Sequence, residues 1–223
     1  MNLPLHKPLL YLITNRQAFL RLTECDTDAS RLQLEAIRQA AAAGCQLIQI
    51  REKDLPARAL ADFTRQAIAA ARPYGAKVLV NDRLDVALAT RADGVHLRVT
   101  SLPAHEVRRI VRQKGLQEFL IAVSTHSLAE AQTAAADGAD FIVCGPVFDT
   151  PSKREFGAPL ELERFAEICQ SLSIPVLALG GINLANFREP LQRGASGIAA
   201  IGLFTRTETL DSTIQTLLAP FAP

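Results

Sequence analysis

The segment 49–54, Gln-Ile-Arg-Glu-Lys-Asp, carries the side chains with the clearest chemical potential. Successive side chains of a strand point to opposite faces, so we expect Gln49, Arg51 and Lys53 to share one face and the isoleucines at 48 and 50 to share the other. An amide followed by two cations is suited to binding a ligand in which a polar ring is joined to a phosphate. A strand that ends in solvated charges is the alternative, and this segment alone does not decide between them.

The segment 81–83, Asn-Asp-Arg, adds a carboxylate at the end of another expected strand. Magnesium accepts one or two carboxylates together with water and substrate phosphate oxygens, so Asp82 is a candidate metal ligand. An Asp that caps a helix is the common alternative at such a position. The same end of the sheet is expected to carry the cations Arg51, Lys53 and Lys153. Their positive charge indicates that an anion binds there, with or without a metal.

Glycines in two later turns predict a second anion site. Gly180 and Gly181 follow the seventh expected strand and Gly202 follows the eighth, where barrels of parallel strands commonly hold a phosphate. The backbone N–H groups of such turns are accessible because glycine has no side chain. Tight turns that simply require glycine are the alternative. Asn183 is expected to cap the next helix and so to add its dipole to the site.

The loop 145–153 is rich in turn formers and ends with Thr150, Ser152 and Lys153, which supply two hydroxyls and an ammonium group. This composition predicts a lid that closes over a phosphate. An ordinary surface loop is the alternative.

Two of the four histidines lie on expected strands or at their ends. His126, just beyond Ser124 on the fifth strand, is placed for proton transfer, with structural support of its neighbours as the alternative. His96 lies inside a strand and is expected to be a buried core residue. His6 and His105 are expected to be solvated.

A repeated unit predicts the scaffold that must position these residues. The end of an Ala-rich helix, a Gly suited to a left-handed cap and a short apolar strand recur at 41–50, 89–97, 134–143 and 192–201. Four more strands are expected at 9–14, 77–81, 120–125 and 175–180, with amphipathic helices at 57–71, 127–136 and 160–171. The spacing of Ser127 and Glu130 predicts a capping box for the second of these helices.

Apolar strands that alternate with helices indicate a parallel sheet covered by helices. Eight such units in 223 residues predict a (β/α)8 TIM barrel in one domain spanning residues 1–223, with an open doubly wound sheet as the alternative. In a barrel the functional residues lie at the C-terminal ends of the strands. The polar and glycine residues described above do follow the expected strands.

Composition excludes several classes of partner. With 48% apolar residues and no dividing linker, the chain can bury one core. The 24 basic and 23 acidic residues are well mixed, so no face for nucleic acid stands out and small-molecule partners are expected. No signal peptide or membrane span is recognisable, which predicts a cytoplasmic protein. The spacing of Cys25, Cys45, Cys144 and Cys169 favours reduced thiols, with Cys45 and Cys144 buried.

Six motifs in the same order together resemble thiamine phosphate synthase and its close relative, thiazole tautomerase. The resemblance covers about residues 10–204 and rests on Tyr11-Leu12-Ile13-Thr14, Gln49-Ile50-Arg51-Glu52-Lys53-Asp54, Val80-Asn81-Asp82-Arg83, Asp93-Gly94-Val95-His96-Leu97, Gly145-Pro146-Val147-Phe148 with Thr150 and Lys153, and Leu179-Gly180-Gly181-Ile182.

The resemblance implies a barrel enzyme that joins hydroxymethylpyrimidine diphosphate to thiazole phosphate and releases pyrophosphate. Pyrophosphate departs first and the thiazole nitrogen captures the pyrimidine carbocation, so the step needs charge stabilisation on the leaving group. By position, the resemblance implies pyrophosphate contacts from Arg51, Lys53 and Lys153, a pyrimidine contact from Gln49, a diphosphate contact from Asn81, a magnesium ligand in Asp82, a hydroxyl pair in Thr150 and Ser152, a contact near the reacting carbon from Ser124, and thiazole phosphate turns at Gly181 and Gly202.

The chain departs from this pattern at specific positions. After His96-Leu97 the synthase usually continues Gly-Gln-x-Asp, whose Asp is a second magnesium ligand, whereas this chain has Ser101 at that place and Arg98 three residues before it. Gly202 stands where the family commonly has Ser. The runs 124–127 and 156–160 resemble the tautomerase, in which a His at the position of His126 is implied to shuttle a proton.

We expect the synthase, because the relative typically lacks both the Lys of the Arg-Glu-Lys run and the Asn-Asp pair. A thiazole tautomerase acting through His126 and a non-catalytic barrel that binds a thiamine precursor are the alternatives. Whether the chain forms a homodimer is left open.

Overall fold

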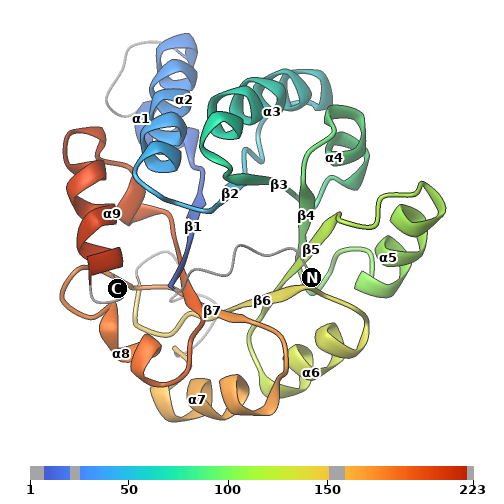
Figure 1. The fold of residues 1–223 in the computed structure, drawn as a ribbon, viewed down its shortest axis with the longest axis vertical. Coiled ribbons are helices and arrows are strands. Elements are labelled where there is room, and N and C mark those ends of the chain that lie inside the picture. The colour runs from blue at the N-terminus through green and yellow to red at the C-terminus, as the bar shows by residue number, and fades with distance from the viewer. Residues whose placement is uncertain (1–7, 21–25, 151–158, 220–223) are drawn as a thin grey trace. The chain divides into compact units, whose positions relative to one another are not determined.

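The computed structural model describes residues 8–20, 26–150 and 159–219. In this part, eight parallel strands follow chain order in one closed barrel (Figure 1). They are β1 (Leu9–Ile13), β2 (Leu47–Ile50), β3 (Lys77–Asn81), β4 (Gly94–Leu97), β5 (Leu120–Thr125), β6 (Phe141–Cys144), β7 (Val176–Leu179) and β8 (Gly197–Ala200). The predicted (β/α)8 barrel is confirmed and the open sheet is excluded.

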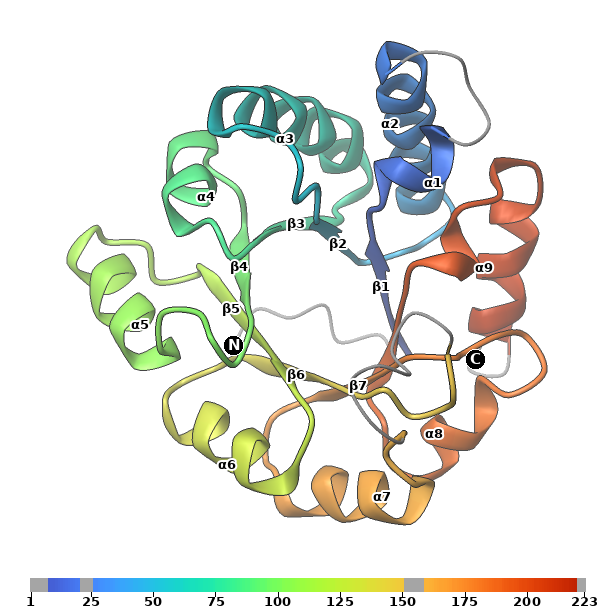
Figure 2. The same cartoon turned by 180° about the vertical axis from the view of Figure 1, so that it is seen from behind.

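Helices alternate with the strands (Figures 1 and 2). They are α1 (Arg16–Leu20), α2 (Asp26–Ala42), α3 (Ala57–Ala71), α4 (Leu84–Thr90), α5 (Ala104–Gln113), α6 (Leu128–Ala136), α7 (Leu162–Ser171), α8 (Arg188–Gln192) and α9 (Leu210–Leu218), with 3-10 turns η1 (Arg72–Tyr74), η3 (Gly202–Phe204) and η4 (Thr207–Thr209). Within the described residues no helix combines the length and apolar character needed to cross a membrane.

The chain forms two compact units, which we name by their place in the sequence. The outer unit comprises Leu10–Val95 with Ala200–Pro223, and the inner unit comprises Met1–Leu9 with His96–Ala199. In the outer unit β1 pairs with β2 and β2 with β3, placing Gln49 opposite Leu79. In the inner unit β5, β6, β7 and β8 pair in turn, with Ser124 opposite Val143. A single domain over the whole chain stays a prediction.

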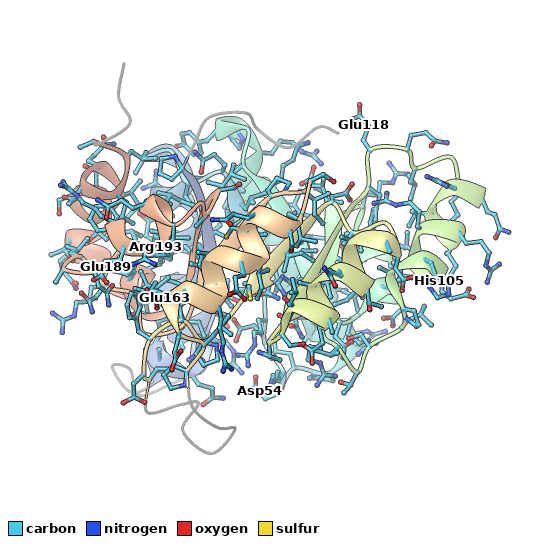
Figure 3. The ribbon with its side chains drawn as sticks, turned by 90° about the horizontal axis from the view of Figure 1, so that it is seen from below. Asp54, His105, Glu118, Glu163, Glu189 and Arg193 are labelled. Atoms are coloured by element: carbon cyan, nitrogen blue, oxygen red, sulfur yellow. The ribbon has the colours of Figure 1, made fainter. Side chains whose placement is uncertain are left out.

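The strands are buried along nearly their whole length, as expected of parallel strands covered by helices. In the outer unit α2 packs against α3, and the two views agree in placing them side by side (Figures 1 and 2). In the inner unit Arg193, which ends α8, donates to Glu163 of α7 at 2.8 Å (Figure 3). Cys45 and Cys144 are buried free thiols, as predicted.

The predicted glycine caps are right at three of the four repeats. Gly44, Gly138 and Gly194 have φ of +105°, +88° and +100° at the ends of their helices. At the repeat 89–97 the prediction is wrong, because Arg91 takes the left-handed conformation, with φ of +55°, and Gly94 instead begins β4. The α4 helix therefore ends with Arg91 as its C-cap, a residue type that sequence patterns do not mark as a helix cap.

Candidate active site

An amide pair joins the C-terminal ends of β2 and β3. The Gln49 side chain is only 2% exposed, and its Nε2 donates to Asn81 Oδ1 at 3.2 Å. Each amide carries both donors and acceptors, so the pair keeps hydrogen-bonding capacity for a planar polar ligand. Two of the residues predicted to bind substrate, Gln49 and Asn81, are therefore in direct contact.

The cations of the same segment follow the end of β2. Arg51 is half-buried and Lys53 is exposed, whereas Glu52 between them is 4% exposed. That Gln49, Arg51 and Lys53 share one face stays a prediction, since Lys53 and Asp54 are both exposed. The backbone N–H of Arg51 donates to Thr14 Oγ1 at 2.9 Å, which fixes the start of the cationic segment to the end of β1.

Asp82 is half-buried and has a φ of +63°, an uncommon conformation outside glycine. It is not the N-cap of α4, since that position is Arg83, whose side chain makes no cap hydrogen bond. The Arg83 guanidinium instead donates to both carboxylate oxygens of Asp85, and this hydrogen bond lowers the pKa of Asp85. The helix-cap interpretation of Asp82 is therefore wrong, and the neighbouring carboxylate already has a cationic partner.

The described residues contain no group of three or more His, Cys, Asp or Glu side chains that could hold a metal ion. Magnesium, however, commonly keeps several waters and binds through one or two carboxylates and the phosphates of a substrate. A single carboxylate such as Asp82 fits that mode of binding.

In the inner unit, Ser124 has a histidine partner that was not foreseen. His96 of β4 is 2% exposed, and its Nε2 lies 2.7 Å from Ser124 Oγ of β5. The expectation that His96 is buried is confirmed. Its contact with a candidate catalytic hydroxyl depends on side-chain directions on two strands, which the sequence does not reveal.

His126 is exposed, and its ring is oriented by the backbone. Nδ1 is hydrogen-bonded to the Gly145 carbonyl, while the His126 N–H donates to Glu130 Oε2 at 2.7 Å. A carbonyl only accepts, so Nδ1 carries the proton and Nε2 holds the lone pair of the neutral ring. Ser127 Oγ caps α6 by accepting from Glu130 N at 3.2 Å, so half of the predicted capping box is present.

The loop after β6 is joined to the turn after β7. Val147 N donates to Leu179 O at 2.8 Å and Phe148 N donates to Gly180 O at 3.1 Å. Gly181 has a φ of +66°, and a Cβ there would lie 2.7 Å from Asp149 O. The turn after β7 therefore needs glycine both for its conformation and for this close approach.

Asn183 does not cap a helix. Its Oδ1 accepts from Ala185 N at 2.8 Å, whereas α8 begins at Arg188 with Phe187 as N-cap. The predicted contribution of a helix dipole from Asn183 is wrong, because its side chain closes a local turn instead.

Gly202 differs from Gly181 in its surroundings. It is exposed, it begins η3, and a Cβ added to it would meet no heavy atom within 4 Å. Backbone conformation and packing require glycine at Gly181, whereas the surroundings of Gly202 leave room for a larger side chain. A role of the Gly202 N–H in binding stays a prediction.

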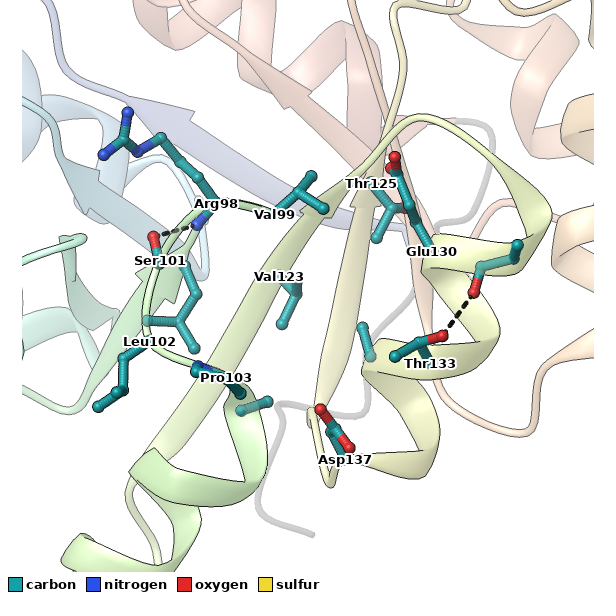
Figure 4. A pocket seen from close by; sticks show the side chains of 14 residues that line it. Arg98, Val99, Ser101, Leu102, Pro103, Val123, Thr125, Glu130, Thr133 and Asp137 are labelled. Carbon is teal, nitrogen blue, oxygen red and sulfur yellow. Dashed lines mark hydrogen bonds between the residues drawn. The ribbon is translucent and has the colours of Figure 1, made fainter.

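The turn at Arg98 is closed by Ser101. Arg98 N donates to Ser101 Oγ at 2.8 Å, and Ser101 N donates to Arg98 O at 3.0 Å. The Arg98 side chain is exposed and points away from Thr133 and Asp137 (Figure 4). The Ser101 hydroxyl thus stabilises the turn.

Beside this turn lies a pocket of about 370 Å³ within the inner unit (Figure 4). Val99, Leu102 and Val123 form an apolar wall, and Glu130 and Asp137 of the α6 segment face it. Both carboxylates have partners, His126 N for the first and His105 Nδ1, at 3.1 Å, for the second.

The loop that is predicted to form a lid is described only in part. Thr150 is half-buried at its beginning, and Ser152 and Lys153 lie outside the described residues. Their assigned contacts stay predictions.

Comparison with known proteins shows which family this sequence and structure resemble. A family model described as thiamine monophosphate synthase matches residues 10–204. The chain belongs to the thiamine monophosphate synthase family. Within this family, the thiamine-phosphate synthase of Roseiflexus sp. (strain RS-1) is 38% identical over 193 residues, which are 86% of this chain and 76% of the relative. The thiamine-phosphate synthase of Methanoculleus marisnigri is 43% identical over 171 residues, 77% of this chain and 79% of the relative.

A solved structure extends the agreement to three dimensions. Thiamine phosphate pyrophosphorylase from Pyrococcus furiosus is similar with a TM-score of 0.78 and 33% identity, covering 96% of this chain and 98% of that one. A 3-hexulose-6-phosphate synthase reaches a TM-score of 0.68 at 15% identity, which reflects the shared barrel alone. The family resemblance expected from the motifs is confirmed.

Proposed function

We propose that the protein is a thiamine phosphate synthase, a transferase that couples hydroxymethylpyrimidine diphosphate to thiazole phosphate. The observation that carries the proposal is the set of groups at the exits of β2 and β3, where the Gln49–Asn81 amide pair is followed by Arg51 and Lys53. A planar ring with a diphosphate matches this set. Relatives and a structural neighbour named for the same product, similar over most of their length, support it.

The reaction breaks the bond between the pyrimidine methylene carbon and the diphosphate oxygen, and the electron pair leaves with pyrophosphate. The thiazole nitrogen then donates its lone pair to that carbon and becomes a thiazolium cation. In our proposal Arg51 and Lys53 stabilise the charge that develops on the leaving oxygen, with Lys153 as a third cation. No side chain needs to act as a strong base in this step.

Asp82 is the proposed magnesium ligand, with Asn81 binding the diphosphate beside it. When bound, the ion would offset the charge of the diphosphate and so favour its departure. The rest of the ion's ligands would be water and phosphate oxygens, because magnesium commonly takes only one or two carboxylates, and Asp85, three residues further on, is paired with Arg83.

The second substrate is assigned to the glycine turns. The backbone N–H groups at Gly181 and Gly202 are proposed to bind the thiazole phosphate, Ser124 to contact the reacting carbon's surroundings, and Thr150 and Ser152 to close over the diphosphate. The close packing at Gly181 supports a preformed turn, whereas Gly202 contributes a backbone donor in an open setting.

A specific observation favours a second activity, thiazole tautomerisation. With Nδ1 of His126 held by the Gly145 carbonyl, Nε2 is the basic nitrogen of a ring that is exposed and able to accept a proton. A barrel that binds a thiamine precursor without turnover is the remaining alternative, and the retained cations argue against it.

One experiment separates these functions. Purified protein is supplied with the pyrimidine diphosphate and thiazole phosphate, and thiamine phosphate formation and thiazole isomerisation are followed in parallel. We expect coupling in the wild type, its loss in Lys53→Ala and its retention in His126→Ala. Isomerisation without coupling, abolished by His126→Ala, would identify a tautomerase. Binding without either reaction would identify the non-catalytic barrel.

The magnesium assignment has a test of its own. Ser101→Asp restores the carboxylate expected of the family and should shift the magnesium dependence of turnover to lower concentration, because added negative charge offsets the dehydration of the ion. Arg98→Gly in the same titration shows whether that guanidinium supplies part of the missing countercharge. Turnover that does not respond to magnesium in any of the three proteins would exclude Asp82 as a metal ligand.

We also propose one domain over residues 1–223, which the lack of a dividing linker supports. A cytoplasmic location is proposed as well. The substrates are small molecules. Analytical ultracentrifugation would show whether the chain forms a homodimer.

A further inference from the structure

The two acidic residues of the 51–54 segment bind a single buried arginine. Arg16, the first residue of α1, is 2% exposed. Its backbone N–H donates to Glu52 Oε2 at 2.9 Å, and its Nη2 donates to Asp54 Oδ2. Gln17 Nε2 adds a second bond to Asp54 Oδ2 at 2.8 Å. Alternate residues of the segment thus have separate functions, since the acids hold α1 while the intervening residues are cations.

The Thr14 hydroxyl extends this network to the start of the segment. Thr14 is fully buried, and its Oγ1 accepts from Arg51 N at 2.9 Å while it also hydrogen-bonds to the Glu52 carboxylate. A hydroxyl can accept and donate at once, so both bonds are compatible. Thr14 N also donates to Gln49 O at 2.9 Å. The backbone is therefore fixed on both sides of Arg51.

Burying the charged groups of this network costs more free energy than packing alone would require. Glu52 is 4% exposed, and its Oε1 has no hydrogen-bond partner among the described residues. Burial raises the pKa of Glu52, while Thr14, Arg16 N–H and the Arg16 charge oppose that shift. Apolar side chains would fill such a space at lower cost than a buried carboxyl and a buried guanidinium group. The charged residues are better explained by the need for directional hydrogen bonds that orient the 51–54 segment.

We propose that Arg16 is a positioning residue which, through Glu52 and Asp54, orients the 51–54 segment so that Arg51 and Lys53 present their cations to the diphosphate. The inference rests on the proposed function, because it assumes that these cations bind the leaving group. Catalytic groups must be held within a fraction of an ångström of their working positions, and an error of about 1 Å can cost roughly a hundredfold in rate.

Asp54→Asn is the most informative variant, because Asp54 is 42% exposed and its replacement leaves the buried Glu52 bond in place. A matched control exists in the inner unit. Asp140 accepts from Arg108 Nη2 at 2.6 Å and from Ile121 N at 2.7 Å, with 20% of the Asp140 side chain exposed. Asp140→Asn removes an equivalent charge from a partly buried arginine that has no assigned part in binding.

The probe is inorganic pyrophosphate, titrated by calorimetry with magnesium present, alongside coupling kinetics and thermal unfolding of the same proteins. We expect Asp54→Asn to weaken pyrophosphate binding about tenfold and to raise the KM for the pyrimidine diphosphate, since both cations shift together. Asp140→Asn should lower the unfolding temperature while leaving pyrophosphate affinity and KM at their wild-type values. Arg16→Gln should repeat the effect of Asp54→Asn and exceed it.

The outcomes distinguish this inference from the proposed function. Wild-type coupling together with unchanged pyrophosphate affinity in Asp54→Asn would overturn the positioning role alone, and so would equal losses of affinity in Asp54→Asn and Asp140→Asn. A wild-type protein that neither couples the substrates nor binds pyrophosphate would overturn both. If Arg16→Gln does not fold, Asp54→Asn and its control still decide the question.

Discussion

Replacing Gly181 by alanine tests the proposed phosphate turn most directly. Gly181 has a φ of +66°, and an added Cβ would lie 2.6 Å from Phe148 Cβ and 2.7 Å from Asp149 O. A left-handed conformation costs an L-residue roughly 1–2 kcal/mol, and overpacking of this kind costs about 1–3 kcal/mol more. We therefore expect Gly181→Ala to lower the free energy of unfolding by about 2–5 kcal/mol.

Gly115→Ala is the matched control, because it isolates the cost of conformation. Gly115 lies in the same unit with a φ of +73°, and no heavy atom lies within 4 Å of the added Cβ. Its expected cost is roughly 1–2 kcal/mol. In a chain of this size, each kcal/mol lowers the melting temperature by about 2–4 °C, so Gly115→Ala should melt about 2–8 °C below the wild type. Gly181→Ala should melt lower still.

The kinetic assay then separates stability from binding. The added Cβ at Gly181 clashes with the backbone and a Cβ atom of the loop after β6, which cannot move without displacing that loop. The backbone N–H groups of the turn should therefore lose their alignment with the phosphate. At a temperature where all variants are folded, we expect kcat/KM for thiazole phosphate to fall about a hundredfold in Gly181→Ala, the scale of losing one preorganised donor. Gly115→Ala should keep wild-type kinetics. Equal kinetics in the two variants would refute the assignment of this turn to phosphate binding.

Further predictions concern the outer unit and the thiols. Lys53→Ala should lower turnover about a hundredfold without lowering the melting temperature, because its side chain is exposed; near-wild-type turnover would contradict its role. Burial raises the pKa of Glu52, so the folded protein binds this proton more tightly and its stability falls as pH rises from the ordinary carboxyl pKa through the raised one. Urea unfolding of Glu52→Gln at stepped pH should lack this component. Burial also raises the pKa of Cys45 to about 12 and that of Cys144 to about 11, so iodoacetamide at neutral pH should modify both only after unfolding, as peptide mass spectrometry can check.

Much of the fold could be predicted because parallel strands leave a strong local signal. The bounds of β3 (Lys77–Asn81), β5 (Leu120–Thr125) and α3 (Ala57–Ala71) are those expected from apolar runs and helical periodicity. The seventh strand was expected at 175–180 but spans Val176–Leu179. Pro175 has no N–H for the ladder and Gly180, with φ of +99°, turns away from it.

The site was predictable to the extent that it depends on strand ends and alternation. Gln49 and Asn81 were assigned to neighbouring strand exits, and they are hydrogen-bonded to each other. The sequence does not predict the pairings of His96 with Ser124 and of Arg16 with Asp54. Such contacts depend on the register of strands and on rotamers, which leave no periodic trace in a single sequence.

The bonds that join the loop after β6 to the turn after β7 also provide a built-in sensor. Val147 N and Phe148 N are donors to Leu179 O and Gly180 O, so their exchange with deuterated solvent requires the two segments to separate. A ligand seated on the Gly181 turn would oppose that separation and slow the exchange of these two amides. Occupancy of the thiazole phosphate site could thus be measured in the unlabelled protein, one substrate at a time and without any turnover.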